Sequence, residues 1–305
     1  MRAARPPRPP VDAWRPLGQH VEDERTPGGL ARTLTVFLAG AECPFTCVFC
    51  DLWRQTTVAP TPPGALPHQL RLALASVHGE TPRRLKLYNA SNFFEPRAVP
   101  PADLPALAAL AAGFEVVTVE CHPRLVLASH AWVAFAGALR GRLEIAMGLE
   151  TVHPDASARL GKQMTLAEYD AACLRLRAQG VGLRAFVLLG VPFVPAGEAV
   201  AWTVRSVEHA LARGADVVSI IPVRGGNGTL ERLAAEGTFH APTLRQLEDA
   251  LAAAIGHGPG VVLADLWDAE RLAACALCRA PRLERLARMN ARGVLEPRVP
   301  CACGS

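Results

Sequence analysis

Short β-rich runs alternate with longer runs of helical period through most of the chain, and this rhythm restricts the fold more than any other feature. Such alternation is typical of βα units arranged around a parallel sheet. Six βα units fit either an open doubly wound sheet or a complete or partial barrel, and both bind ligands at the carboxyl ends of their strands. The predicted strands cover residues 32–39, 84–89, 115–120, 142–149, 182–190, 216–222 and 260–265. The predicted helices cover residues 66–78, 103–112, 128–139, 165–179, 197–213 and 242–255.

The two ends of the chain differ from this repeating region. Residues 1–28 contain six prolines and several arginines, which predicts a flexible arm. We place the core domain at residues 29–257 and a cysteine-rich C-terminal extension at residues 258–305. The longest uncharged stretch of the apolar regions, residues 125–139, has 15 residues, short of the roughly 20 that cross a bilayer. The basic N-terminus is followed by no apolar run, so we expect a cytoplasmic protein without a membrane partner.

The net charge of +4 gives little support to nucleic-acid binding. Of the 32 Lys and Arg residues, only Lys86 and Lys162 are lysines, and the basic residues form no block of five or six like charges. A solvated basic surface is therefore the simpler interpretation.

Three of the nine cysteines form a compact motif directly after the first predicted strand. Cys43, Cys47 and Cys50 have the pattern C-x3-C-x2-C. Three thiolates from one loop can hold three irons of a cubane 4Fe-4S cluster, whereas electron carriers supply four cysteines. One iron then stays open to a small ligand. Three thiols without a metal, or a zinc site with a distant fourth ligand, are the alternatives.

This motif, with the aromatic Phe49 directly before the third cysteine, resembles that of the radical S-adenosylmethionine (SAM) superfamily. The resemblance implies an α/β fold, a partial (β/α)6 TIM-like barrel, with a 4Fe-4S cluster and SAM as cofactors and Phe49 among the cofactor-binding residues. It implies an enzyme that reductively cleaves SAM to a 5'-deoxyadenosyl radical, which abstracts hydrogen from a substrate. An electron donor such as ferredoxin or flavodoxin is implied as a partner. The catalytic residues stay unassigned, because the cofactor carries the chemistry.

The resemblance also implies SAM-binding roles for residues at the ends of the next strands. Superfamily members contact the methionine amino group after strand two, where this chain has Asn89, Ser91 and Asn92. They contact the ribose from strands three and four, where Glu120 and Glu150 stand. Alternation along the strand places Glu120 towards the mouth of the barrel.

Two further polar residues each have two interpretations. Arg184 is a charge inside an apolar strand, and it either pairs with the methionine carboxylate or forms a structural ion pair inside the barrel. His122 lies near the expected site and either lines the barrel or transfers a proton.

Four longer sequence segments resemble those of a narrower family, the radical SAM subunit associated with archaeosine synthesis in tRNA and its bacterial relatives. They lie at residues 86–97, 119–123, 183–193 and 216–220. The phrase Gly-Leu-Glu-Thr at 148–151 is typical of the branch that contains the elongator catalytic subunit and the MiaB/NifB-like enzymes. The resemblance implies tRNA or a partner subunit as possible partners, while small-molecule and peptide substrates stay open.

Four cysteines near the end of the chain form two pairs, Cys275-x2-Cys278 and Cys301-x-Cys303. This spacing predicts either a second iron-sulfur cluster or a zinc site, with unmetallated thiols as the third alternative. The C-x-C pair is tighter than the usual zinc spacing, which favours iron.

The competing function is a non-catalytic iron-sulfur or zinc module for electron transfer or binding. The long array of βα units argues against it, because an electron carrier needs no such pocket.

Overall fold

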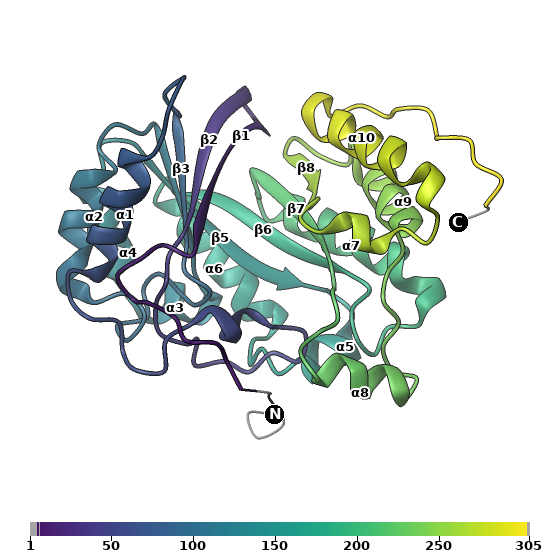
Figure 1. Ribbon diagram of the computed structural model, residues 1–305, viewed down its shortest axis with the longest axis horizontal. Coiled ribbons are helices and arrows are strands. Elements are labelled where there is room, and N and C mark those ends of the chain that lie inside the picture. Colours follow the sequence, from purple (N-terminus) through teal and green to yellow (C-terminus); the bar gives the residue numbers. More distant parts are fainter. Residues whose placement is uncertain (1–4, 6, 304–305) are drawn as a thin grey trace.

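The computed structural model describes residue 5 and residues 7–303, and these residues form one eight-stranded sheet in sequence order (Figure 1). Strands β2 to β8 run parallel, and β1 pairs antiparallel with β2. The strands are β1 (Gly18–Thr26), β2 (Gly29–Phe37), β3 (Arg84–Tyr88), β4 (Val116–Glu120), β5 (Arg142–Glu150), β6 (Gly182–Leu189), β7 (Val217–Pro222) and β8 (Val261–Ala264).

Most of the helices lie on the outer face of the curved sheet, whereas α8 lies away from the strands (Figure 1). They are α1 (Ala65–Ala75), α2 (Leu104–Leu110), α3 (Pro123–Ala128), α4 (Ala131–Ala138), α5 (Pro154–Arg159), α6 (Leu166–Ala178), α7 (Ala199–Ala212), α8 (Thr229–Ala235), α9 (Leu244–Ala254) and α10 (Ala276–Arg292). Helix α1 contacts α2 and α2 contacts α4 on one side of the molecule, while α7 contacts α9 on the other. The predicted partial TIM-like barrel with a cysteine-rich C-terminal segment is confirmed.

The two faces of the sheet carry different side chains. Leu34, Leu85 and Val117 are fully buried and belong to the main apolar core, which includes residues of the surrounding helices. Lys86 follows Leu85 on β3, and Thr118 follows Val117 on β4. The register of the two strands pairs Lys86 directly with Thr118. Because successive side chains point to opposite faces of a strand, the polar residues line the interior of the barrel.

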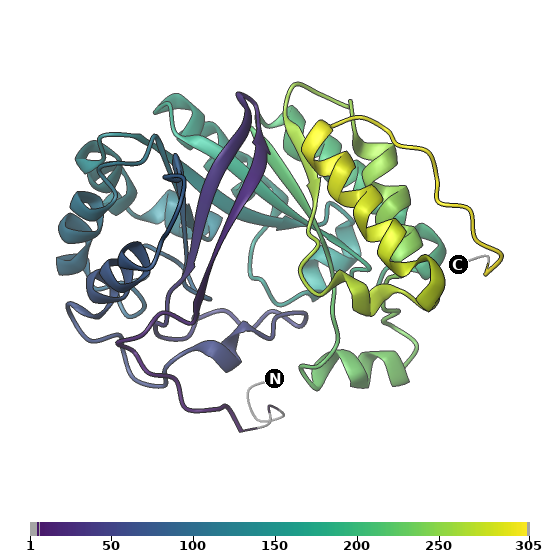
Figure 2. The same cartoon turned by 45° about the horizontal axis from the view of Figure 1, so that its top comes forward.

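Strand β1 differs from the sequence prediction, which placed residues 18–26 in a flexible arm. This segment pairs with β2 over its whole length, and the chain reverses at residues 27–28. The β1–β2 hairpin stands between α1 and α10 (Figure 2). Helix α10 contacts both β1 and β8, and a Cβ at Gly293, just after α10, would overlap the Arg25 guanidinium. The hairpin and α10 together thus cover the gap between the two edges of the barrel.

The remaining differences concern short elements and one boundary. Helices α3, α5 and α8 have six or seven residues, too few for a helical period to stand out in the sequence. Strand β8 pairs with β7, so the barrel continues beyond residue 257 into the region assigned to the extension. In the part of the chain that the structure describes, no helix has the length and apolar character needed to cross a membrane.

Candidate functional site

The three thiols of the C-x3-C-x2-C motif lie on the loop that follows β2, at the carboxyl end of the first parallel strand. Cys43, Cys47 and Cys50 are half-buried, and none forms a disulfide. Burial raises the pKa of Cys47 and that of Cys50 to about 12. These thiols therefore keep their protons at neutral pH, and a metal must displace the protons when it binds.

A buried asparagine on another loop holds the end of the cysteine loop. Asn227 lies between β7 and α8, and its Nδ2 donates to the carbonyl oxygens of Val48 at 2.9 Å and Cys50 at 3.4 Å. Its Oδ1 accepts from the backbone N–H groups of Thr229 and Leu230 in the first turn of α8. Asn227 thus ties the third cysteine to α8.

Asn92 and His122 support the first cysteine. Asn92 Nδ2 donates to Cys43 Sγ at 3.3 Å, and Asn92 Oδ1 accepts from the His122 backbone N–H at 2.7 Å. His122 Nδ1 accepts from the Arg124 N–H at 3.2 Å, which leaves Nε2 to donate to the Lys162 carbonyl at 3.0 Å. Burial, with the charge of Lys162, lowers the pKa of His122 to about 3. His122 is therefore neutral and used in packing, as the first of its two interpretations states.

Glu150 and Lys162 form a buried ion pair at the carboxyl end of β5. A Cβ at Gly148 would overlap both side chains, so only glycine leaves room for the pair. The register of β5 against β6 shifts between Gly148 and Glu150, and Glu150 has a φ of 65°. A left-handed backbone is costly for a residue with a side chain, and such strain is common at functional sites.

Glu120 lies near this pair at the end of β4. Burial raises the pKa of Glu120 to about 7, the charge of Glu150 adds to the rise, and the Asn89 N–H and the Lys162 charge oppose it. Glu120 and Glu150 therefore form a pair of carboxylates in different environments, one next to a cation and the other held mainly by a backbone N–H. Both predicted ribose contacts thus face the same mouth.

Two polar side chains after β3 are buried without a hydrogen-bond partner. Asn89 is fully buried, and neither its Oδ1 nor its Nδ2 has a partner. Ser91 Oγ is also buried and unpartnered. Leaving a buried amide or hydroxyl unsatisfied costs about 1–3 kcal/mol, so such groups at a strand end fit a site completed by a polar ligand. An amino acid cofactor such as SAM meets that need.

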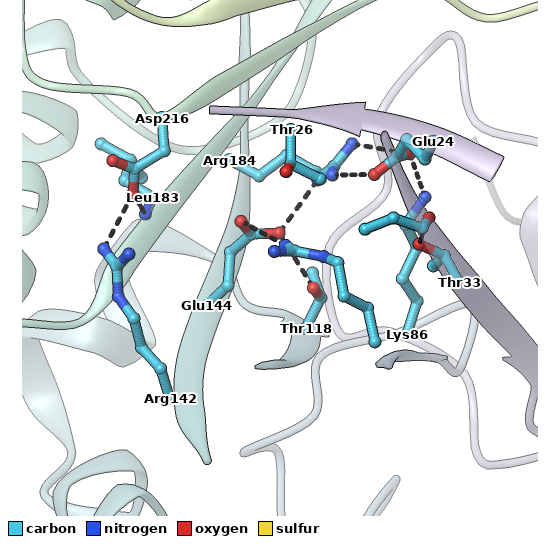
Figure 3. Close-up of polar contacts among 12 residues, drawn as sticks. Glu24, Thr26, Thr33, Lys86, Thr118, Arg142, Glu144, Leu183, Arg184 and Asp216 are labelled. Carbon is cyan, nitrogen blue, oxygen red and sulfur yellow. Dashed lines mark hydrogen bonds and ion pairs between the residues drawn. The ribbon is translucent and has the colours of Figure 1, made fainter. Parts of the chain in front are cut away.

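Arg184 belongs to a buried network of ion pairs inside the barrel, nearer the amino ends of the strands than the cysteine loop (Figure 3). Its guanidinium bonds Glu24 of β1 at 2.5 Å and Glu144 of β5 at 3.2 Å, and it also donates to Ser219 at 3.3 Å. Burial alone would raise the pKa of Glu24, but the charges of Arg184 and Lys86 outweigh burial and lower it to about 2. Of the two interpretations of Arg184, the contacts favour the structural ion pair.

Lys162, and not Arg184, is the cation that pairs with Glu150 at the carboxyl end of β5. Sequence analysis missed it because it lies between α5 and α6 and not at a strand end. The available signal was its rarity, since only Lys86 and Lys162 are lysines. Phe49 is half-buried and packs against the smaller apolar cluster that contains Val48.

The four C-terminal cysteines converge. Cys275 Sγ lies 3.9 Å from Cys301 Sγ, and Cys278 Sγ lies 3.7 Å from Cys303 Sγ. All four sulfurs lie within 4.8 Å of one another, and the residues described by the structure contain no other group of three or more Cys, His, Asp or Glu side chains this close.

Comparison with solved structures identifies the fold. A radical SAM methyltransferase from Sphaerobacter thermophilus aligns with a TM-score of 0.54 and 16% identity over 84% of this chain and 78% of that chain. The chain has the radical SAM fold. The Elp3 protein of the archaeon Methanocaldococcus infernus, lacking its N-terminus, aligns with a TM-score of 0.54 and 12% identity over 73% of this chain. Methylornithine synthase (PylB) aligns with a TM-score of 0.51 and 14% identity over 75% of this chain.

These likenesses are structural only. The chain spans 64% of the length of the methylornithine synthase chain and 59% of the Elp3 chain. No protein-family model matches the sequence, and no curated protein matches it. In this radical SAM fold, the cysteine triplet, the Glu150–Lys162 pair and the unpartnered groups after β3 all gather at the carboxyl ends of the strands, where barrels of this type bind their ligands.

Proposed function

We propose that this protein is a radical SAM enzyme whose Cys43, Cys47 and Cys50 hold a 4Fe-4S cluster with one open iron. The observation that carries the proposal is the three-thiol loop beside buried polar groups that have no partner within the protein. When bound and reduced, such a cluster would supply one electron to SAM, which would split into methionine and a 5'-deoxyadenosyl radical that abstracts hydrogen from a substrate. An electron-transfer module would need a fourth cysteine ligand. It would not need buried polar groups without hydrogen-bond partners at the mouth of the barrel.

Different residues at the mouth bind different parts of SAM. Asn89 Oδ1 and Ser91 Oγ accept hydrogen bonds from the amino group of the methionine part, since neither oxygen has a partner within the protein. Lys162 binds the carboxylate, because its ammonium is the buried cation at this end of the barrel. Glu120 and Glu150 accept hydrogen bonds from the ribose hydroxyls. Asn92 and Asn227 hold the cysteine loop in place through Cys43 and Cys50.

The edge of the cysteine loop fits an acidic electron donor such as ferredoxin or flavodoxin. Arg5, Arg8 and Arg54 lie over the Trp53 ring, with guanidinium carbons 4.7, 5.9 and 5.4 Å from its centroid. Arg5 and Arg8 also bond Glu42, the residue before the first cysteine of the motif. These arginines place positive charge beside the cluster loop, and such charge speeds the encounter with an acidic partner.

The test is anaerobic reconstitution followed by incubation with dithionite and SAM. We expect four irons at the triplet and release of 5'-deoxyadenosine, measured by chromatography with mass detection. The Cys43→Ala/Cys47→Ala/Cys50→Ala variant should lose these irons and the product. The matched control Cys173→Ala removes a buried core thiol and should keep both. A triple variant that still forms 5'-deoxyadenosine would contradict the proposal.

The substrate implied by the resemblance, tRNA, stays a prediction. Mass spectrometry of tRNA nucleosides from a deletion strain tests it, and an unchanged nucleoside profile would contradict it.

A further inference from the structure

The four C-terminal cysteines have the spacing of ligands to a single metal ion. Four thiolates at about 2.3 Å from a tetrahedral zinc lie about 3.8 Å from one another. Two of the sulfur pairs are 3.9 Å and 3.7 Å apart, and the whole group fits within 4.8 Å. In a 4Fe-4S cluster each cysteine thiolate binds a different iron of the cubane. The four cysteine sulfurs are therefore farther apart than they are around a single ion.

The protein brings the two cysteine pairs together through contacts that do not involve the sulfurs. Cys275 is the N-cap of α10, and Gly293, with a φ of 66°, ends the helix and turns the chain back. Arg285 then donates to the Glu296 and Pro297 carbonyl oxygens at 2.8 to 3.0 Å. The returning segment is therefore held along α10, and it ends beside the first turn of the helix.

Further ion pairs hold this segment against the body of the protein. Arg285 bonds Glu248 of α9 at 2.9 Å, with both side chains buried. Arg298 of the returning segment bonds Asp249 of α9 at 2.7 Å. The cysteines thus meet at a site preformed by α9, α10 and the returning segment, which lowers the entropy lost on metal binding.

The surroundings suit a doubly charged thiolate complex. Four thiolates and one zinc ion carry a net charge of −2, which the amino-terminal end of a helix and nearby cations stabilise. Cys275 and Cys278 lie at the N-terminal end of the 17-residue helix α10, and Arg282 lies one turn further on.

We propose that Cys275, Cys278, Cys301 and Cys303 bind one zinc ion, and that this ion fastens α10 across the open edge of the barrel. Helix α10 contacts β1 and β8, the two edge strands of the sheet. The ion therefore has a structural role, separate from the cluster proposed at Cys43, Cys47 and Cys50.

Metal analysis of the full-length protein tests the proposal. We expect one zinc per chain besides the four irons of the triplet, and zinc X-ray absorption should report four sulfur ligands at about 2.3 Å. The Cys301→Ser/Cys303→Ser variant should lose the zinc, keep the four irons, and exchange the amide hydrogens of α10 and β1 faster. Cys173→Ala is the control and should keep both metals.

Eight irons in the wild-type protein, four of them lost in the Cys301→Ser/Cys303→Ser variant, would overturn the proposal in favour of a second cluster. A wild-type protein without zinc after expression with zinc supplied would overturn it as well. The absorption measurement uses wild-type protein alone, so it decides the question even if the variant fails to fold. Loss of the triplet's irons with zinc retained would count against the proposed radical chemistry and not against the zinc site.

Discussion

The barrel contains two buried charge clusters, and each has one of the two lysines of the chain. In the lower cluster, Lys86 pairs with Glu24, and Arg184 joins Glu24 to Glu144 (Figure 3). In the upper cluster, Lys162 pairs with Glu150 at the carboxyl ends of the strands. The two pairs look alike, but their surroundings differ.

The difference lies in how completely the polar groups are satisfied. In the lower cluster, Arg184 uses all three of its guanidinium nitrogens within the protein. In the upper cluster, Asn89 and Ser91 have unpartnered side-chain atoms, and burial raises the pKa of Glu120 to about 7. Both carboxylates of the lower cluster are paired with cations, although Arg84 Nε has no partner, and such a network stabilises the fold. The unpartnered amide and hydroxyl of the upper cluster fit a polar ligand instead. Changes to the lower cluster should therefore alter stability, and changes to the upper cluster should alter SAM binding.

The largest expected effect is the loss of Arg184. Arg184→Met leaves Glu24 and Glu144 buried with fewer positive partners, and breaking a buried pair in this way costs about 3–5 kcal/mol. Urea unfolding of the metal-free protein measures the loss. The control Arg83→Gln removes an exposed pair with Glu115 and should change the stability far less, because water screens exposed charges. Equal effects of the two substitutions would contradict the structural role of the lower cluster.

The second effect is the acid sensitivity of the same cluster. The pKa of Glu24 is lowered from its ordinary 4.5 to about 2 in the folded protein, so its stabilising contribution is complete above pH 4.5 and is lost as the pH falls towards 2. A shift of this size corresponds to about 3 kcal/mol. The stability difference between wild type and Glu24→Gln should therefore shrink over this range of pH, as urea unfolding at a series of pH values will measure. A difference that does not change with pH would show that Glu24 is not the titrating group.

The third effect belongs to the upper cluster. Glu150→Gln removes a carboxylate from the mouth while keeping its shape, and we expect SAM binding to weaken by about 1.5–3 kcal/mol, the value of a lost charge-assisted hydrogen bond. Equilibrium dialysis of the reconstituted protein measures the dissociation constant. The control is Glu115→Gln, which changes an exposed glutamate at the opposite end of the strands. Unchanged SAM binding in Glu150→Gln would remove Glu150 from the site.

The smallest effect should separate stability from function most clearly. Asn89→Leu replaces an unsatisfied buried amide with an apolar side chain of similar size, so stability should stay the same or rise by about 1 kcal/mol. SAM binding should weaken by about 1 kcal/mol, because one hydrogen bond to the cofactor is lost. Asn92→Leu is the matched comparison, since Asn92 is satisfied by Cys43 and His122 and should lose stability. A stability loss in Asn89→Leu equal to that in Asn92→Leu would contradict the account.

The sequence predicted the parts of this molecule that depend on local pattern. Every predicted strand is present, because the outer face of each strand carries an apolar residue at every second position. Strand β1 escaped prediction because its most deeply placed long side chain is that of Glu24, a charge satisfied by residues distant in the sequence, and Val21 is its one large apolar residue. Its residues 18–26 therefore carry no apolar signal.

The candidate site was predictable where its residues lie within one segment or end a predicted strand, as Glu120 and Glu150 do. The cysteine triplet is such a segment, whereas Lys162 and Asn227 reach the site from loops far along the chain. For Arg184 the sequence left open a cofactor contact or an ion pair, and the position of Glu24 on β1 was needed to decide. The spacing of the C-terminal cysteines favoured iron, whereas the distances between their sulfurs fit a single tetrahedral ion and support the zinc proposed above.

The most direct test of the central claim is the electron paramagnetic resonance spectrum of the reduced cluster at Cys43, Cys47 and Cys50, recorded with and without SAM. If one iron is open to SAM, as proposed, the spectrum should change on addition of SAM, and the change should require more SAM in Glu150→Gln. A reduced 4Fe-4S spectrum that saturating SAM leaves unchanged would contradict the claim and indicate a fully ligated electron-transfer cluster.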